Sequence, residues 1–231
     1  MEDTTIIDQL DHIIQENKYS KHPFVADVVR GKADKDGLRA WAIQKYFQVY
    51  YQVQGFSAIH SSCEKEDVRQ FMAEQIEEEE TGGHEATDSH YNLMKRFAKA
   101  LGAQDSDFEV AEVGEAVKSH FSRLMSICKE EHFVYGLLAF YVFESQTSES
   151  AMKMFSGFKQ HLGMSDEDLE WFTVHGEADI EHSKMHRDFL FKYCKDVPGF
   201  EQRAIELVEE GCANWNSLQD FYYSLIDREH A

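Results

Sequence analysis

The sequence contains few residues that break helices. Of its 231 residues only two are proline, Pro23 and Pro198, and thirteen are glycine. Proline fixes its own φ angle and removes a backbone donor, so a helix ends or bends where one occurs. So few breaks in so long a chain favour long helices, and no alternating strand pattern competes with them. The sequence therefore predicts an all-α protein.

Cysteine is also scarce. The chain has four, none in a C-x-x-C pair: Cys63, Cys128, Cys194 and Cys212. This scatter indicates neither a disulfide framework nor a zinc knuckle. Reduced thiols are typical of the cytosol, where disulfides are rare.

Positive charge and long apolar runs are the remaining absences. The chain has 23 Lys and Arg against 43 Asp and Glu, which gives a net charge of −20. Proteins that bind nucleic acids or anionic membranes need clustered Lys and Arg, and this composition argues against both partners. The longest apolar run, Phe133 to Phe143, is shorter than the roughly 18 residues that cross a membrane. The acidic start Met1-Glu2-Asp3-Thr4 is unlike a secretory signal. We therefore expect a cytoplasmic protein without a nucleic-acid or membrane partner.

Apolar residues are sufficient for a large core. They make up 42% of the chain, and the length suits a single helical domain over residues 1–231. Periodicity and capping residues predict helices over Thr5–Lys18, Pro23–Gly31, Leu38–His60, Lys65–Glu80, Asp88–Leu101, Val117–Phe155 (interrupted near Lys129–His132), from Ser165 up to the Pro198–Gly199 break, and over Glu201–Asp227.

The segment from His175 to His182 carries the sharpest pattern. His175, Asp179 and His182 are spaced i, i+4, i+7, which places them within roughly 60° of one another on one helix face. Imidazole and carboxylate together suit iron, manganese or zinc. The alternative interpretation is an exposed polar stripe on a surface helix.

Glu144 is a second candidate, because it follows a strongly apolar segment. It shares a helical stripe with Leu137, Phe140 and Tyr141, so its carboxylate projects where apolar neighbours pack. A carboxylate buried alone is costly, and a metal is one partner that would neutralise it. The alternative is a glutamate at the core rim with its charge in water.

A run of four glutamates, 77–80, precedes His90. On a helical wheel Glu79 lies over the centre of the apolar stripe, Glu77 lies opposite, and the other two lie to the sides. An unbroken helix would separate Glu79 from His90 by roughly 16 Å. The two could share a dinuclear site, with its metals about 4 Å apart, only if the helix breaks, and Gly82-Gly83 supplies a break.

Together these segments offer three carboxylates and three imidazoles: Glu79, His90, Glu144, His175, Asp179 and His182. Helical bundles build di-iron sites from inward-facing Glu and Glu-x-x-His pairs. Asp179-x-x-His182 is such a pair with Asp in place of Glu. The set is sufficient for two metal ions with open positions.

The sequence resembles the haem-oxygenase-like di-iron oxidases and oxygenases. Within them it is most similar to the chlamydial para-aminobenzoate-forming type, and more distantly to thiaminase II and pyrroloquinoline-quinone synthesis protein C. The matching residues run from about 6 to 190: Asp8–Asp11, Ile13–Gln15, Ser57–Ser61, His90, Ala100–Gly102, Tyr141, Glu144–Gln146, Phe172–Thr173, His175, Glu177–Asp179 and His182. The resemblance implies a seven-helix bundle, usually dimeric, with a ferrous cofactor that activates dioxygen.

The resemblance also implies a division of the ligands. Glu79, Glu144 and His175 match the ligands of one metal, and His90, Asp179 and His182 match those of the other. The chain has about three extra residues between Glu79 and His90, so Glu80 is the alternative to Glu79. His186 continues the His182 stripe and is expected to hydrogen-bond a ligand.

Two positions depart from the para-aminobenzoate-forming members. Those members consume one of their own tyrosines, where this chain has Val25, and use a lysine where it has Met154, beside Lys153. Some N-oxygenating relatives add a glutamate on the third helix, where this chain offers Gln52 and Gln54. The first departure argues against aminobenzoate made from the protein's own tyrosine in that way. The missing glutamate weakens, without excluding, an N-oxygenase.

The leading hypothesis is a non-haem oxidoreductase that uses two irons, or an iron and a manganese, and dioxygen on a small organic substrate. An amine or amino-acid-like substrate, an external reductant and a homodimer are expected from the resemblance. The alternatives are a para-aminobenzoate synthase-like protein, a metal-free enzyme resembling thiaminase II or the pyrroloquinoline-quinone protein, and a partner-binding helical module.

Overall fold

Helices supply the regular structure of this chain. The computed structural model describes residues 5–84 and 86–226, apart from the side chains of residues 177–179. Within these residues the elements are α1 (Ile6–Glu16), η1 (Tyr19–Lys21), α2 (Pro23–Val29), α3 (Lys35–Ser62), α4 (Glu66–Thr81), α5 (His90–Ala100), α6 (Asp105–Val110), α7 (Glu115–Glu130), α8 (Phe133–Leu162), α9 (Glu170–Tyr193), η2 (Cys194–Asp196) and α10 (Phe200–Ser224). The predicted all-α class is confirmed.

The described residues form ten α-helices, so the expected count of seven was too low. The predicted interruption near Lys129–His132 is confirmed, because α7 ends at Glu130 and α8 begins at Phe133. The His132 ring caps α8 by accepting a hydrogen bond from the Val134 amide. The short helix α6 was not predicted. Helix α9 begins at Glu170 and not near Ser165, because Ser165 Oγ instead accepts from the Asp168 amide in a preceding turn.

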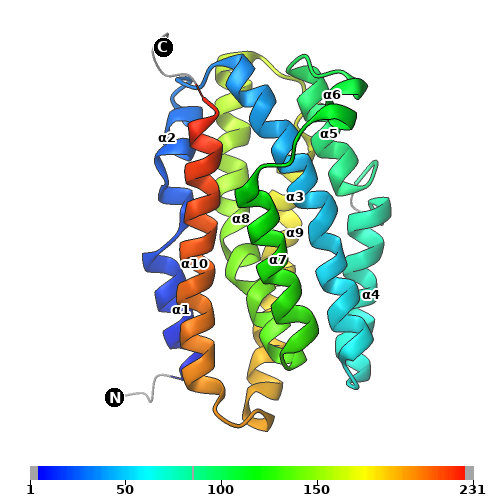
Figure 1. Ribbon diagram of the computed structural model, residues 1–231, viewed down its shortest axis with the longest axis vertical. Coiled ribbons are helices and arrows are strands. Elements are labelled where there is room, and N and C mark those ends of the chain that lie inside the picture. Colours follow the sequence, from blue (N-terminus) through cyan, green and yellow to red (C-terminus); the bar gives the residue numbers. More distant parts are fainter. Residues whose placement is uncertain (1–4, 85, 227–231) are drawn as a thin grey trace.

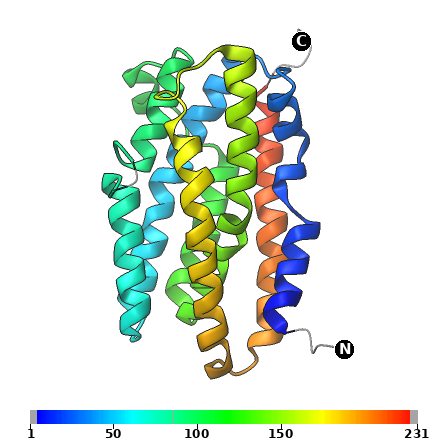
Figure 2. The ribbon, with the colours of Figure 1, turned by 180° about the vertical axis from the view of Figure 1, so that it is seen from behind.

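The long helices lie side by side along the length of the molecule (Figure 1). Helices α8 and α9 form the most extensive pair, and α3 packs against α4, α5 and α7. On the opposite side of α8 lie α10 and α2, and α1 packs on α10, as both views show (Figures 1 and 2). Residues of α4, α5, α8 and α9, distant in sequence, therefore meet inside one bundle.

Aromatic side chains fix how these helices pack. Trp41 of α3, Phe97 of α5, Phe158 of α8 and Phe172 of α9 contact one another, with ring centroids 5.0 to 6.4 Å apart. All four are buried. Truncating such a side chain to alanine typically costs about 3–5 kcal/mol, because a cavity remains. This cluster holds α5, α8 and α9 in register.

Asp11 on α1 links two of these helices, α8 and α9. Its carboxylate accepts hydrogen bonds from Tyr141 Oη of α8 at 2.6 Å and from Arg187 Nε of α9 at 3.0 Å. Burial and the Asp11 carboxylate raise the pKa of the Tyr141 phenol, which stays protonated and donates. Tyr141 lies one turn before Glu144, so the contact fixes the part of α8 that carries this candidate ligand.

Helix α8 is the longest, with 30 residues. Its first half contains the apolar run from Phe133 to Phe143, which is buried as predicted. Its second half carries charged residues such as Lys153 and Lys159. No helix in the described part of the chain combines the length and apolar character needed to cross a bilayer.

Candidate metal centre

The turn after α4 brings Glu79 and His90 together. Helix α4 ends at Thr81, and Gly82 follows in the left-handed conformation at φ +83°. A Cβ there would lie 2.7 Å from the Asp88 carbonyl oxygen, so only glycine fits this fold-back. As a result His90 Nδ1 lies 3.2 Å from Glu79 Oε2, and the predicted break at Gly82-Gly83 is confirmed.

The loop between α4 and α5 is also tied to α9. The backbone amide of Thr87 donates to Glu170 Oε1 at 2.7 Å, and its hydroxyl donates to Oε2 at 2.6 Å. Arg96 of α5 also pairs with Glu170. These contacts overcome the effect of partial burial and lower the pKa of Glu170, which is the first residue of α9. They fix the position of the loop relative to His175, which lies five residues after Glu170 on the same helix.

Three of the six predicted ligands form one compact group, which differs from the implied division in that it joins His90, instead of Glu144, to Glu79 and His175. One ligand atom each from Glu79, His90 and His175 lie within 4.8 Å of one another. The His90 and His175 rings are 4.7 Å apart between centroids, and both are buried. The Glu79 side chain is 12% exposed, which agrees with its predicted inward direction, whereas Glu77 is exposed.

Hydrogen bonding sets the state of His175. Its Nδ1 lies 2.8 Å from the Trp171 carbonyl oxygen, which can only accept, so Nδ1 carries the proton and Nε2 keeps its lone pair. Burial, followed by the neighbouring His90, lowers the pKa of His175 well below its ordinary value. A neutral imidazole with one fixed nitrogen is the form that binds a metal.

His90 and Glu79 have buried atoms without hydrogen-bond partners. Burial acts to lower the pKa of His90, but the Glu79 carboxylate beside it outweighs burial and raises it. Within the described structure both His90 ring nitrogens and Glu79 Oε2 lack a partner in hydrogen-bond geometry. Buried polar groups are normally satisfied. Orphaned imidazole and carboxylate atoms that converge on one point fit a metal ion.

Glu144 pairs with His186, outside the compact group. Its Oε2 lies 3.1 Å from His186 Nε2, and the two side chains are 3% and 0% exposed. Both atoms lack a hydrogen-bond partner among the described residues, as does His186 Nδ1. The buried direction predicted for Glu144 is therefore observed. His186 therefore approaches a candidate ligand, but the expected hydrogen bond between them is not formed.

His182 contacts a glutamate that the sequence did not single out. Its Nε2 lies 3.0 Å from Glu78 Oε2, and Gln75 Nε2 donates to the same oxygen at 3.0 Å. The helical wheel placed Glu78 only at the side of the apolar stripe. Glu78 is half-buried in the structure, and the signal available in the sequence was its spacing of seven residues from Phe71.

Two further candidates complete the set. Asp179 lies outside the residues whose side chains the structure describes. Glu80, the alternative to Glu79, is exposed and accepts a hydrogen bond from Tyr91 Oη at 3.2 Å. It does not belong to the compact group of ligand atoms.

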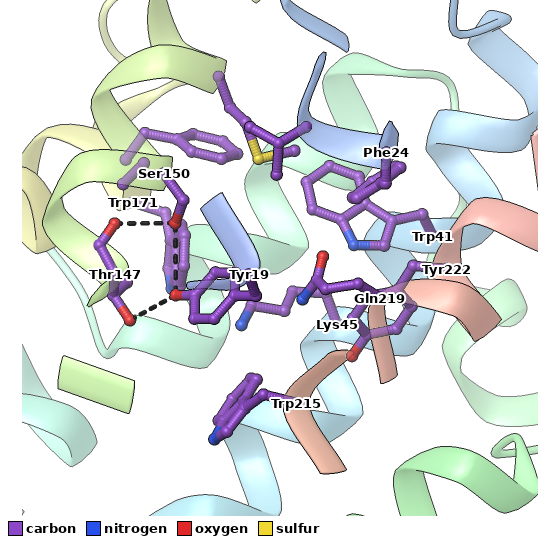
Figure 3. A pocket seen from close by; sticks show the side chains of 14 residues that line it. Tyr19, Phe24, Trp41, Lys45, Thr147, Ser150, Trp171, Trp215, Gln219 and Tyr222 are labelled. Carbon is purple, nitrogen blue, oxygen red and sulfur yellow. Dashed lines mark hydrogen bonds between the residues drawn. The ribbon is translucent and has the colours of Figure 1, made fainter. Parts of the chain in front are cut away.

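A pocket, shown in Figure 3, lies near the group formed by Glu79, His90 and His175. It is separated from His175 by Trp171, whose indole stacks on the His175 ring with centroids 4.0 Å apart. Val25 and Met154 both line it, as does Tyr19. Lys153 does not, because its Nζ pairs with Glu149 at 2.6 Å on the exposed side of α8. Sequence reasoning missed Trp171 and Lys45 as pocket residues.

The fold and the site together define a helical-bundle protein with a candidate metal centre. Residues 39–216 match the family model described as iron-containing redox enzymes, of the haem-oxygenase-like type. The chain belongs to this family, and it is accordingly an oxidoreductase.

Its relatives include proteins named 4-aminobenzoate synthase. One from Chlamydia trachomatis is 31% identical over 222 residues, covering 96% of this chain and 92% of the relative. Another from Nitrosomonas europaea is 30% identical, covering 96% of this chain and 93% of the relative.

Solved structures support the fold. A TenA homologue from Pseudomonas syringae has a TM-score of 0.80 at 11% identity, covering 94% of this chain and 91% of that one. A CADD-like protein of unknown function from Nostoc punctiforme has a TM-score of 0.70 at 19% identity, covering 95% of each chain. At such identities the likeness concerns the fold alone.

Proposed function

We propose that this chain is a dinuclear non-haem iron oxidase or oxygenase that uses dioxygen to oxidise a small organic substrate. The observation that carries the proposal is the buried group of Glu79, His90 and His175, whose ligand atoms lie within 4.8 Å of one another. The orphaned atoms of Glu79 and His90 support it, because a metal would satisfy them. The family described as iron-containing redox enzymes supports iron over zinc.

The residues would divide between two metal positions. Glu79, His90 and His175 would hold one ion. Glu144 and His182 would contribute to the second, together with Asp179, the ligand predicted from the sequence. Two irons bound by these residues would supply the redox capacity to activate dioxygen.

The surrounding residues prepare this group for metal binding. The Trp171 carbonyl holds the proton of His175 on Nδ1, so that Nε2 is available. His186 lies against Glu144, and Gln75 donates to Glu78, which contacts His182. Such outer contacts orient ligands and tune their basicity. The aromatic surroundings, including Phe71 and Phe140 around His186, exclude water.

Anaerobic titration with Fe(II) tests the proposal. Wild-type protein should bind about two irons per chain, because six ligands of this type satisfy two ions. Glu79→Ala should weaken binding at one position by about tenfold or more, since a ligand is lost. Glu77→Ala is the matched control with the same charge change on the exposed face, and it should bind as wild type. Addition of oxygen and a reductant should then consume oxygen in the wild type.

Two results would contradict it. If reconstituted wild-type protein holds well under one metal per chain, the metal-free, thiaminase II-like alternative is favoured. If Glu79→Ala binds two irons at wild-type affinity while Glu80→Ala does not, the assignment along α4 is shifted by one residue. Equal small losses in all variants would indicate a solvated acidic face.

The relatives named 4-aminobenzoate synthase raise that activity as a second candidate. Against the self-consuming route stand Val25 and Met154, which line the pocket but carry neither a phenol nor an amine. Two phenols, those of Tyr19 and Tyr222, and one amine, that of Lys45, line the same pocket. We further propose that the enzyme uses an external reductant. We also propose that it is a homodimer, which sedimentation of the iron-loaded protein would test.

A further inference from the structure

A second cavity, the outer cavity, lies between α7, α8 and α10. Most of its lining is apolar and comes from all three helices: Leu124 of α7, Ala139 and Phe143 of α8, and Leu207 and Trp215 of α10. Each of these residues is at most 8% exposed. Among the described residues, Trp215 is the one that lines both this cavity and the pocket, at whose edge it lies in Figure 3. The outer cavity is therefore a separate space.

The polar residues of the outer cavity come from α7 and α10. Arg123 is 27% exposed and donates to Glu210 Oε2 at 2.9 Å, so its charge is paired towards solvent. His120 Nδ1 donates to the Asn214 side chain, and its Nε2 is the one buried lining atom without a partner among the described residues. A buried water typically makes about three hydrogen bonds, so a single orphaned acceptor holds water weakly. The lining therefore favours an apolar occupant.

The outer cavity adjoins a third space, the inner cavity, which contains a candidate metal ligand. The inner cavity is lined by His175, Trp171 and Val49 and shares Phe143 and Trp215 with the outer cavity. The Phe143 and Trp215 rings are 5.2 Å apart between centroids. These two rings are therefore the partition between the outer cavity and the space at His175.

The pocket reaches the inner cavity as well. The two share Lys45, Thr147, Trp171 and Trp215. Two approaches of different character therefore converge on His175. One is the pocket, with aromatic and polar walls, and the other is the largely apolar outer cavity.

The size of the outer cavity limits what it can hold. Its volume is about 20 Å³. On the same measure a cavity needs at least about 10–15 Å³ to hold one water-sized molecule, so this cavity has room for about one. Apolar protein cavities bind small apolar molecules such as xenon. A diatomic gas meets both conditions, whereas an organic substrate with a ring is too large.

From this geometry we propose that the outer cavity takes up dioxygen and passes it between Phe143 and Trp215 to the inner cavity at His175. The inference rests on the proposed function, because it gives the dioxygen of that reaction a route of its own. A separate route matters because an organic substrate in the pocket would block access for the gas from that side. The pocket then serves the organic substrate alone.

Methyl NMR of the metal-free protein under oxygen pressure tests the uptake, since dissolved dioxygen is paramagnetic and speeds the relaxation of nuclei that it contacts. The methyl groups of Leu124 and Leu207 should gain several-fold more relaxation than those of Leu93. Leu93 is 1% exposed and lines none of the three cavities. Nitrogen at the same pressure is the diamagnetic control.

Ala139→Leu fills the outer cavity from α8 and should remove most of the extra relaxation at Leu207. Ala151→Leu is the matched control, because Ala151 is buried on the same helix but lines the pocket, and it should keep that relaxation. In iron-loaded enzyme Ala139→Leu should lower kcat/KM for dioxygen several-fold. It should leave kcat at saturating oxygen near the wild-type value, because the change alters access and not the ligands.

The inference is overturned if Leu124 and Leu207 gain no more relaxation than Leu93, or if Ala139→Leu keeps either the extra relaxation or the wild-type kcat/KM for dioxygen. If Ala139→Leu does not fold, Leu124→Phe fills the same cavity from α7 and replaces it in both measurements, with Leu207 as the reporter.

The relaxation measurements use protein without iron, so the two proposals can fail separately. Loaded protein that consumes no dioxygen would remove the proposed function and leave the uptake of gas into the outer cavity intact. Oxygen consumption without extra relaxation at Leu207 would overturn the inference alone.

Discussion

His120 on α7 offers a sharp test of the electrostatics inside the bundle. The side chain is buried behind the pocket wall, with its ring 4.4 Å from that of Trp215. Its Nδ1 lies 2.5 Å from Asn214 Oδ1, an acceptor, so Nδ1 carries the proton. Nε2 has no partner in the described structure, so a second proton there would leave a buried charge unsatisfied. Burial lowers the pKa of His120 to about 4.

The size of the effect follows from that pKa. An unfolded histidine titrates near 6.5, so between pH 6.5 and 4 the unfolded chain binds a proton that folded His120 does not. Stability therefore falls as the pH falls through this window. Between pH 7.5 and 5.0 the loss from His120 is about 2 kcal/mol, and by pH 4 it approaches about 3 kcal/mol.

Urea unfolding at pH 7.5 and 5.0, with chelator present, measures this. His120→Asn keeps a donor near the Nδ1 position and removes the titrating group, so its stability should fall by about 2 kcal/mol less than that of the wild type between the two pH values. His12→Asn, on the exposed face of α1, is the control and should follow the wild type. If wild type and His120→Asn lose equal free energy of unfolding between pH 7.5 and 5.0, the reasoning is refuted. A difference in stability that is the same at both pH values does not affect this comparison.

Three further outcomes are expected. Gly82→Ala should lower the free energy of unfolding, measured in urea, by about 2–4 kcal/mol and weaken iron binding, because it combines left-handed strain with a clash. Gly163→Ala is the control, since Gly163 has φ +60° and open space around it. This variant should lose about 1 kcal/mol and bind iron as wild type. Chelation should lower the Tm of iron-loaded protein by about 5–10 °C, since an ion at 100 times its Kd contributes about 2.7 kcal/mol; an unchanged Tm in calorimetry would contradict metal binding to the native state. Expression in a strain unable to make aminobenzoate should not restore growth, because Val25 and Met154 lack the needed groups; growth that Tyr19→Phe abolishes would reverse this conclusion.

The sequence was most informative where one helix face is apolar. The stripe of α4 predicted that Glu79 points inward and Glu77 outward, as observed, because side-chain direction follows from helical phase alone. The glycine pair predicted the fold-back that joins Glu79 to His90, since few other residues adopt its backbone. The all-α class followed from the scarcity of breakers.

Features that depend on contacts between distant segments could not be predicted. The wheel could not show that Glu78 meets His182, because that contact depends on how α4 lies against α9. The place of Lys45 between Trp171 and Trp215 requires the packing of α3, α9 and α10, which no local pattern encodes.

The candidate centre is assembled from four helices, and this affects the order of events during synthesis. Glu79 and His175 are 96 positions apart in the sequence, and closing a loop of this length costs an unfolded chain about 4 kcal/mol. A nascent chain that has emerged only through α8 holds Glu79, His90 and Glu144 but none of the α9 histidines. Iron uptake at the proposed centre would therefore wait until α9 has left the ribosome and packed against α8. Cleavage of the chain between these two helices, followed by their separation, would release the metal.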